Sequence, residues 1–248
     1  MLSMGNINQT RTQPSLLGLG PWNCVTKMKN ILIGVGHKFR RGKDTTAEYL
    51  RDVHEFEIWH LCDAIYAECR GCHVRYTVGR TGGDGLEING SNYTHLVGLM
   101  ATVRSWITSA RGSVVHSYSD KDVYEYQGMD GKDGRLLQWW GMDFRRQHFG
   151  SNYWIETIRR RYEVEQPARL VVPDMRFPNE VDWVLSNGGF LWKVARRSPL
   201  GGHGNRDPEH PAETALDDFD GWHAVIENEG DLVCLYEKIE SLLHNLGI

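Results

Sequence analysis

The hydrophobic and polar positions along the chain predict short buried strands that alternate with amphipathic helices. Continuous apolar runs at 31–35 and 169–173 are typical of strands that are covered on both faces in a parallel sheet. The segment 232–246 repeats Leu and Ile at intervals of three and four residues, which predicts a helix with one buried face. This alternation predicts an α/β fold with a largely parallel sheet flanked by helices. By the same patterns, further strands are expected at 57–61, 190–195 and 223–228, and further helices at 45–53, 63–70, 96–110, 136–149, 153–162 and 179–187.

Four stretches lack a clear strand or helix period. Residues 1–28 are polar, and we expect them to form a flexible N-terminal extension ahead of a single domain at 29–248. Residues 75–95 are rich in Gly, Asn and Thr and are interpreted as a long loop or a small excursion. Residues 113–134 are interpreted as a polar segment at the surface or near a site. Residues 196–214 contain Arg, His, Gly and Pro with few apolar side chains, which is the composition of a mobile loop.

Composition and charge argue against several classes of protein. The chain has 248 residues and a formal charge of −4, from 28 Lys and Arg against 32 Asp and Glu, so it lacks the net basic charge of a general nucleic-acid coat. It contains no run of about 18 apolar residues, which argues against a membrane span. The five cysteines are scattered and no signal pattern precedes them, so we expect reduced thiols in a cytoplasmic protein. Neither a nucleic acid nor a membrane is therefore expected as a direct partner.

A glycine-rich loop joins the first predicted strand to the first predicted helix. Gly36 and Gly42 allow backbone N–H groups to surround a phosphate at the helix N-terminus, and Lys43 can reach its β and γ oxygens. The loop departs from the usual P-loop, because five residues instead of four separate the glycines. Asp44 also stands where Ser or Thr normally binds Mg²⁺, with Thr45 one place later. Asp44 implies either Mg²⁺ in the site or a carboxylate directed at the acceptor; the structural alternative is a glycine-rich turn with solvated basic residues.

Three other segments combine charged and aromatic residues in ways that suit a phosphate-binding site. Asp174 and Arg176 follow the strand at 169–173, where open α/β sheets bind ligands. Arg176 is a candidate phosphate clamp, and Asp174 is a candidate metal ligand or acceptor-orienting group. The segment 134–154 mixes Trp with Arg, and 196–213 carries arginines that suit a lid. The structural alternatives are a capping salt bridge at a strand–helix corner, an amphipathic core helix and a solvated loop.

Together, and in this order, these segments resemble the deoxynucleoside monophosphate kinases of tailed bacteriophages. The resemblance covers about residue 30 to the C-terminus, and residues 71–131 match no segment of that family. Its most specific piece is the run from Asp174 to Glu180, which matches the family's Asp-x-Arg-Phe-Pro-Asn-Glu without a change. The other matching segments are Gly42-Lys43-Asp44-Thr45, Leu61-Cys62-Asp63-Ala64, Leu137 to Arg146, Tyr153-Trp154 and His210-Pro211-Ala212-Glu213, with Met142, Asp143 and Ala212 as departures from the family's pattern.

The resemblance implies a P-loop kinase fold with an acceptor-binding insertion at about 60–165 and a mobile lid at about 196–214. It implies transfer of the ATP γ-phosphoryl group, with Mg²⁺, to a deoxynucleoside monophosphate. A homodimer, the bacterial host cytoplasm and a role in supplying precursors for phage DNA replication are likewise expected by resemblance.

The resemblance implies a role for individual residues at the matching positions. The implied catalytic residues are Lys43, Asp44, Asp174, Arg176 and Arg135. The implied nucleotide-binding residues are Gly36, Lys38, Gly42, Lys43, Thr45 and the lid arginines Arg196 and Arg206; Asp44 and Thr45 are also the implied Mg²⁺ ligands. The implied substrate-binding residues are Asp63, Lys132, Gln138, Arg146, Trp154, Asp174, Arg176 and Glu180, with Trp154 stacking on the acceptor base or walling it.

Other functions remain open from the sequence alone. A P-loop kinase for a nucleoside or a sugar would have the same phosphate loop, and so would a non-catalytic nucleotide-binding module. Cys69, Cys72 and His73 copy a haem-attachment pattern and, with Cys62, offer a set of zinc ligands. No second Cys/His pair has suitable spacing, so ordinary helix cysteines are favoured.

Overall fold

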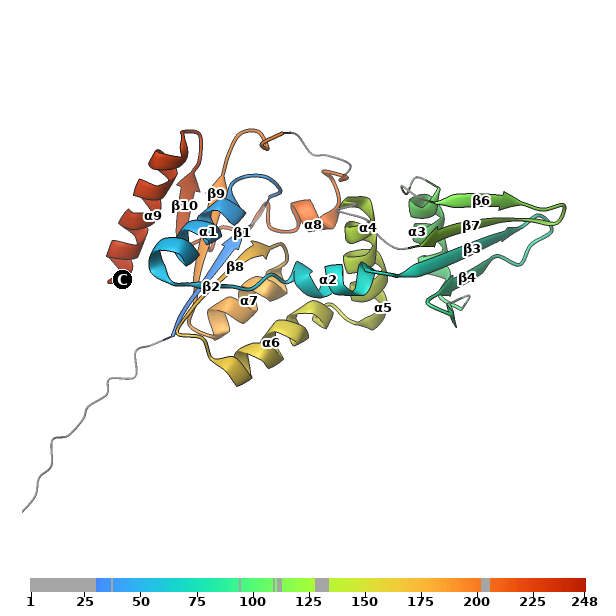
Figure 1. Ribbon diagram of the computed structural model, residues 1–248, viewed down its shortest axis with the longest axis horizontal. Coiled ribbons are helices and arrows are strands. Elements are labelled where there is room, and N and C mark those ends of the chain that lie inside the picture. Colours follow the sequence, from blue (N-terminus) through green and yellow to red (C-terminus); the bar gives the residue numbers. More distant parts are fainter. Residues whose placement is uncertain are drawn as a thin grey trace, which may run out of the picture.

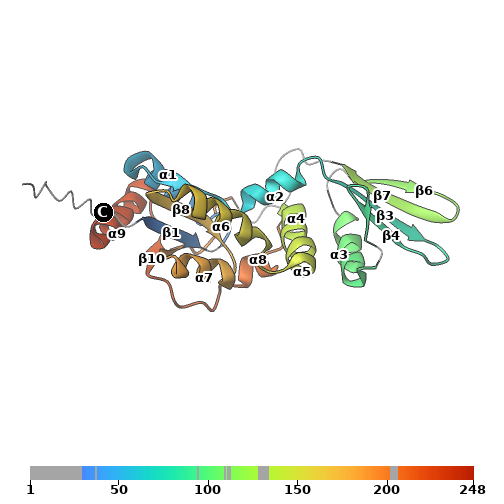
Figure 2. The same ribbon diagram turned by 90° about the horizontal axis from the view of Figure 1, so that it is seen from below.

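The chain folds into an α/β body and a smaller antiparallel sheet that projects from it (Figure 1). The computed structural model describes residues 30–36, 38–93, 95–108, 110, 113–127, 134–201 and 206–248. The expected N-terminal extension at 1–28 lies outside the described residues. The body and the projecting sheet lie at opposite ends of a long molecule (Figure 2). Between them lie α2 (Cys62–Cys69), α4 (Gly134–Gln138) and α5 (Gln147–Phe149).

The body is built on a five-stranded sheet in which every pairing is parallel. Its order is β10 (Ala224–Glu227), β9 (Phe190–Ala195), β1 (Ile31–Gly36), β8 (Arg169–Met175) and β2 (Glu57–Ile58). The central strand β1 is apolar on both faces, because Leu32 packs into one core while Ile33 and Val35 pack into the other. The predicted α/β fold with a parallel sheet is therefore confirmed.

Helices cover both faces of the parallel sheet. α1 (Lys43–His54) and α9 (Leu232–Leu246) share one buried apolar cluster with β1 and β9. α6 (Tyr153–Glu165) and α7 (Pro178–Ser186) share the cluster on the other face. These helices begin and end within a few residues of the predicted bounds. None of the described helices is long and apolar enough to cross a membrane.

The projecting part is an antiparallel sheet, and α3 (Val97–Ile107) shares a buried cluster with one of its faces. Its order is β5 (Ser91–Asn92), β4 (Gly85–Ile88), β3 (His73–Gly79), β7 (Lys121–Gln127) and β6 (Val114–Ser117). The expectation of a long loop at 75–95 is therefore wrong, because β3, β4 and β5 occupy most of it, whereas the alternative of a small excursion agrees with the projecting sheet. The polar segment expected at 113–134 contains β6 and β7 in its described part, and β6 is exposed at the surface, as expected. These strands are hard to recognise in the sequence because one face of the sheet is exposed to solvent. In β3, Val74 and Tyr76 are buried while Arg75 is exposed, so polar residues interrupt the apolar ones.

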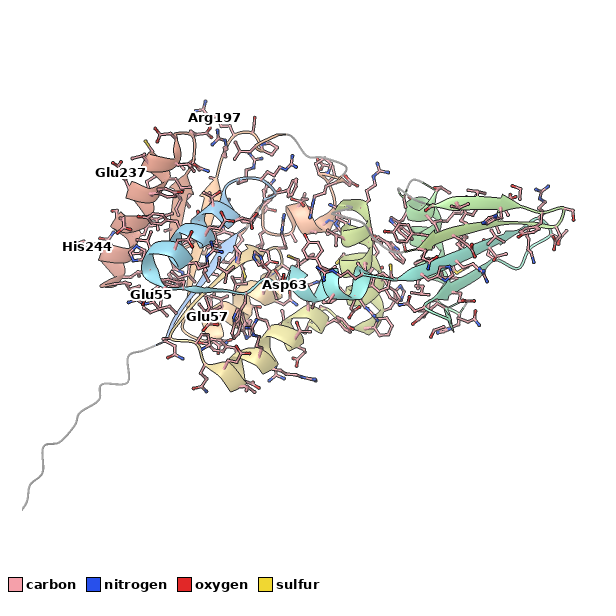
Figure 3. The ribbon with its side chains drawn as sticks, in the orientation of Figure 1. Glu55, Glu57, Asp63, Arg197, Glu237 and His244 are labelled. Atoms are coloured by element: carbon pink, nitrogen blue, oxygen red, sulfur yellow. The ribbon has the colours of Figure 1, made fainter. Side chains whose placement is uncertain are left out.

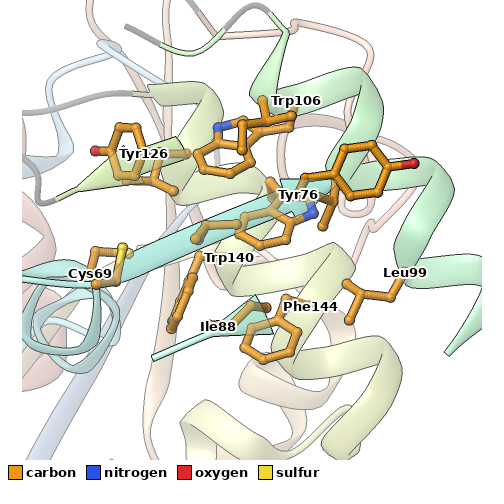
Figure 4. Close-up of a cluster of buried hydrophobic side chains, with 14 of the residues drawn as sticks. Cys69, Tyr76, Ile88, Leu99, Trp106, Tyr126, Trp140 and Phe144 are labelled. Carbon is orange, nitrogen blue, oxygen red and sulfur yellow. The ribbon is translucent and has the colours of Figure 1, made fainter. Parts of the chain in front are cut away.

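A π-helix replaces the middle of the helix predicted at 136–149. Between α4 and α5, the residues Trp139–Arg146 form this π-helix, η1. The wider turn sends both Trp139 and Trp140 into the core beneath the projecting sheet. There, the ring of Trp139 stacks on that of Trp106 with 4.5 Å between centroids, and Trp140 lies with Phe144 in the aromatic cluster of Figure 4. This cluster joins the projecting sheet to the body, and the same π-helix carries Arg146 to the opposite side, toward the body.

Candidate functional site

The phosphate loop lies at the C-terminal end of β1, and close packing requires glycine at both of its ends. A Cβ on Gly36 would lie 2.3 Å from the Trp222 ring. Gly42 has φ of 109°, and a Cβ there would lie 2.4 Å from Nδ2 of Asn228. The same Asn228 amide donates to the Arg41 carbonyl at 2.9 Å. The loop is therefore held from the side of β9 and β10, and close packing is by itself a structural reason for its glycines.

Lys43 is buried at the start of α1, with 4% of its surface exposed. Its Nζ donates to the Lys38 carbonyl at 2.7 Å, so the side chain folds back over the loop. Burial, and after it the positive charge of Arg176, lower the pKa of Lys43 to about 7, against the attraction of Asp44 and Asp174. The next residue, Asp44, is exposed, and Thr45 is half-buried. The first turn of the helix therefore presents a poorly solvated lysine next to an accessible carboxylate.

A cavity lies beyond the C-terminal ends of β8 and β2, between the body and the helices that lead to the projecting sheet, and no described residue of the glycine-rich loop lines it. It encloses about 660 Å³ of space free of atoms, solvent at its mouth included. This volume is within the ordinary range for small-molecule sites. One wall is apolar, with Leu61, Ile65 and Leu137. Among the predicted site residues, the cavity is lined by Gln138, Arg146, Trp154, Asp174, Arg176, Glu180 and Arg206.

Glu213 organises the charged wall of this cavity. Its carboxylate pairs with Arg176 at 2.7 Å and with Arg206 at 3.2 Å, and it accepts the backbone N–H of Phe39 at 3.2 Å. Burial raises the pKa of Glu213, but the two arginines outweigh burial and hold the pKa below its usual range. The carboxylate thus links the phosphate loop, β8 and α8 (Pro211–Thr214) in one ionic cluster. Glu213 belongs to one of the segments that carry the resemblance, but it was not among the predicted site residues.

Arg146 and Glu180 form a second, fully buried ion pair beneath the cavity, with 7% and 3% of their surfaces exposed. The other Glu180 oxygen accepts the N–H groups of Arg176 at 2.6 Å and Phe177 at 3.0 Å. Arg146 donates in addition to the Ser151 carbonyl, and its guanidinium lies 4.1 Å from the Phe177 ring centroid. Burial raises the pKa of Glu180 to about 7, against the opposing pull of Arg146. This pair fixes the backbone that presents Arg176.

Asp174 uses both carboxylate oxygens to anchor the start of α2. One oxygen accepts the N–H of Leu61 at 3.0 Å, and the other accepts the N–H of Cys62 at 2.8 Å. A carboxylate at this position satisfies orphan donors and suits the helix dipole. The structural alternative from the sequence is a capping salt bridge at a strand–helix corner; Asp174 instead accepts two backbone N–H groups, while Arg176 pairs with Glu213. Asp174 also lines the cavity.

Two other predicted residues shape the cavity without being charged. Gln138 and Asp207 exchange hydrogen bonds, with the side-chain amide donating to the Asp207 carbonyl at 2.9 Å and accepting its N–H at 3.0 Å. This clamp ties the segment after 206 to α4. Trp154 is 1% exposed and donates from Nε1 to the Gly141 carbonyl at 2.8 Å. It is a fixed wall of the cavity, whereas Tyr66 and Met142 line the cavity and were not predicted. The position of Tyr66 one helical turn after Cys62 was the available signal.

The remaining predicted residues do not line the cavity. Asp63, labelled on α2 in Figure 3, lies on the exposed side of the helix. Arg135 lines a separate polar hollow beside α3 with Asp143 and His210. Arg196 donates to the Asn228 carbonyl at 2.7 Å and so braces the phosphate loop from behind. Lys38 pairs with Asp217 at 2.8 Å, and Lys132 lies outside the described residues.

The cysteines of the haem-like pattern are core residues. Cys69 and Cys72 are 0% and 1% exposed and belong to the aromatic cluster. Burial raises the pKa of Cys72 to about 11, which opposes the thiolate form that metals bind. Within the described part of the chain, they form no metal-ligand cluster with His73. The expectation of ordinary helix cysteines fits Cys69, at the end of α2, whereas Cys72 lies between α2 and β3.

Comparison with known proteins gives a kinase as a distant relative. Over 122 residues the chain is 27% identical to a protein of Acanthamoeba polyphaga mimivirus that carries the provisional name deoxynucleotide monophosphate kinase. The similarity covers 45% of this chain and 61% of that protein, so the chain matches less than two thirds of the relative's length. No family model matches the chain. The relative's name supports a kinase-type enzyme only weakly, because the identity is low and the aligned part is short.

Proposed function

We propose that the chain catalyses ATP- and Mg²⁺-dependent transfer of a phosphoryl group to a deoxynucleoside monophosphate. The observation that carries the proposal is the proximity of the phosphate-loop lysine to the arginine wall. Lys43 is buried, and Arg176 is near enough to lower the pKa of its ammonium group. Cations that repel one another at a buried site are stabilised by an anion between them. A phosphoryl group passing from the loop side to the cavity side meets this requirement.

On the loop side, Lys43 and the backbone N–H groups around Gly36 and Gly42 would bind the β and γ phosphates of ATP. Asp44 and Thr45 present oxygen atoms at the first turn of α1, and oxygen is the donor that Mg²⁺ requires. The two residues therefore fit the ion, which uses one or two protein oxygens together with phosphates and water in sites of this kind. When bound, Mg²⁺ would neutralise phosphate charge during the transfer.

On the cavity side, two arginines retain donors for an anionic acceptor. Among the described residues, Arg176 donates to protein groups only from its main chain and from Nη1, to Glu213 and the Ala212 carbonyl. Within the same described part of the chain, Arg206 donates only from Nη1, to Glu213. Their other guanidinium nitrogens remain for the phosphate of the acceptor. The apolar wall with Trp154 would then face the base.

The test is formation of ADP from ATP and Mg²⁺ with each deoxynucleoside monophosphate in turn, and with AMP and plain nucleosides for comparison. We expect turnover with at least one deoxynucleoside monophosphate and loss of turnover with EDTA. Lys43→Ala should lower kcat by about 10²-fold or more, since it removes an electrostatic contact that strengthens in the transition state. The matched control is Lys238→Ala, on α9, which removes an exposed lysine away from the cavity.

Each alternative outcome contradicts the proposal in a different way. Turnover with a nucleoside or sugar alone would assign another acceptor class to the same phosphate loop. ATP binding without ADP formation from any of these acceptors would assign a non-catalytic nucleotide-binding module. Equal losses in Lys43→Ala and in Lys238→Ala would show that the lysine in the loop has no special role.

A further inference from the structure

Three potential metal ligands of different chemistry converge beside the cavity. Side-chain ligand atoms of His60, Cys62 and Asp174 lie within 4.8 Å of one another, and each of the three residues is partly exposed to solvent. Cys62 and Asp174 also line the cavity. In the described part of the chain, no other group of three His, Cys, Asp or Glu residues meets this criterion.

The fold explains why these three residues meet. β2 and β8 are parallel neighbours, and the N–H of Trp59 still donates to the Val171 carbonyl at 3.1 Å. The chain then turns, with the N–H of Asp63 donating to the His60 carbonyl at 3.2 Å, and α2 begins. This turn places His60 and Cys62 on either side of Leu61, whose N–H is held by Asp174. The cluster is thus fixed by backbone structure from two separate segments.

We propose that His60, Cys62 and Asp174 bind a thiophilic divalent cation such as Zn²⁺, with an open coordination position toward the cavity. An imidazole nitrogen, a thiolate and a carboxylate are all zinc ligands, and sulfur selects against Mg²⁺. Three protein ligands with a fourth position for water or substrate are the arrangement of exchangeable zinc sites. The site is distinct from the oxygen donors of Asp44 and Thr45 and from the buried pair Cys69 and Cys72.

The geometry needs only a small contraction. Tetrahedral bonds of about 2.0–2.3 Å place ligand atoms about 3.3–3.8 Å apart. The three ligand atoms, which lie within 4.8 Å of one another, therefore need an approach of at most about 1.0–1.5 Å. Side-chain rotation of His60 and Cys62 can supply it, because both are partly exposed. Asp174 is already oriented, since its oxygens accept the N–H groups of Leu61 and Cys62 and keep further lone pairs.

Binding of the cation changes the bonding of Cys62. Its thiol now hydrogen-bonds with the hydroxyl of Tyr66, which follows one helical turn later. Coordination replaces the S–H bond by a sulfur–metal bond, and the proton passes to the buffer. No oxidant or reductant takes part. Because the open coordination position would face the charged wall with Arg176, the bound cation would share the cavity with the proposed acceptor.

The experiment is a Co²⁺ titration of the full-length, metal-free chain, followed by near-ultraviolet absorption from thiolate-to-cobalt charge transfer. We expect one saturable site per chain, reversal by Zn²⁺ and no reversal by Mg²⁺. Cys62→Ser and His60→Ala should each weaken Co²⁺ binding by more than about tenfold, the lower limit seen when even an outer-shell partner is lost. Cys234→Ser is the matched control, because Cys234 is exposed on α9 and should leave the titration unchanged.

A second measurement uses the unmutated chain and so does not depend on how the variants fold. The alkylation rates of Cys62 and Cys234 are compared by peptide mass spectrometry with and without Zn²⁺. Zn²⁺ should slow alkylation of Cys62 by about tenfold or more and leave Cys234 unchanged, because a coordinated thiolate is shielded. Absence of a saturable thiolate–cobalt band, or equal protection of both cysteines, would overturn the proposal. Neither readout requires turnover, so the result is independent of the proposed kinase activity.

Discussion

If the proposed nucleotide binds beside Lys43, its binding should be linked to the protonation of this lysine. In the ligand-free chain, burial and Arg176 lower the pKa of Lys43 to about 7. A bound phosphate next to Nζ reverses both effects, because it pairs with the ammonium and screens it from Arg176. We expect the pKa in the complex to return toward its ordinary value of 10.5. Near pH 8 the free lysine is about 10% protonated, so binding should take up about 0.9 proton per site.

Isothermal titration calorimetry of ATP in buffers with different ionisation enthalpies measures this uptake directly. The apparent Kd should rise about tenfold per pH unit from about pH 8 to pH 9, as protonating the lysine becomes more costly. Near pH 6 the lysine is already about 90% protonated, so the uptake from this group should fall to about 0.1 proton. Lys43→Met should remove the uptake, whereas Lys238→Met should retain it. Proton-independent binding near pH 8 in the unmutated chain would refute the placement of the phosphate beside Lys43.

The lowered pKa of Lys43 also predicts the sign with which the stability of the ligand-free chain changes with pH. Between pH 7 and the ordinary pKa of 10.5, the folded chain binds fewer protons at Lys43 than the unfolded chain does. The contribution of this group to the free energy of unfolding therefore increases with pH across that window. Urea unfolding of the unmutated chain and of Lys43→Met should diverge as pH falls toward 7, with the variant relatively more stable at low pH. A difference that is constant with pH would contradict the lowered pKa of the buried Lys43 ammonium group.

Three further single substitutions and one double variant probe the framework of the site. Glu180→Ala leaves Arg146 buried without its partner and should lower the free energy of unfolding by about 3–5 kcal/mol, whereas the double variant with Arg146→Met should recover part of this loss in urea unfolding. Gly42→Ala introduces a residue at φ of 109° against a close neighbour and should lower stability by about 1–3 kcal/mol in thermal unfolding, with nucleotide affinity falling as well. Glu213→Gln frees Arg176 from its counter-charge and should raise the affinity of the ligand-free cavity for inorganic phosphate by about 2- to 10-fold in calorimetry; weaker phosphate binding would show that positioning by Glu213 outweighs its charge.

Part of the site could be predicted because it is local in the chain. The phosphate loop joins a buried strand to a helix, so its position at the sheet edge follows from connectivity alone. Gly42 and Lys43 take their conformation from that junction. Asp174 and Arg176 follow the neighbouring strand, and parallel strands end at the same edge. Their meeting with the loop was therefore a consequence of the sequence pattern.

Other partners could not be predicted because they join segments far apart in the chain. Glu180 pairs with Arg146 across 34 positions, and Glu213 pairs with Arg176 across 37. A carboxylate in a polar segment gives no signal of whether packing will bury it, and burial is what makes these pairs structural. The second role of Asp174, as the anchor of α2, likewise depends on a backbone N–H contributed from 112 positions away.

The amino-acid sequence by itself determined the α/β body and the phosphate loop, because continuous apolar strands, a glycine-rich turn and an amphipathic helix are local patterns with one stable packing. It did not determine the projecting antiparallel sheet. One face of that sheet is exposed to solvent, and its polar residues obscure the alternation of apolar and polar positions that indicates a strand. Only the tertiary structure decided which charges face the cavity and which are neutralised beneath it. The physical reason is that the sequence decides which side chains can carry a charge. The packing of distant segments decides how far each charged group is desolvated and which partners it has.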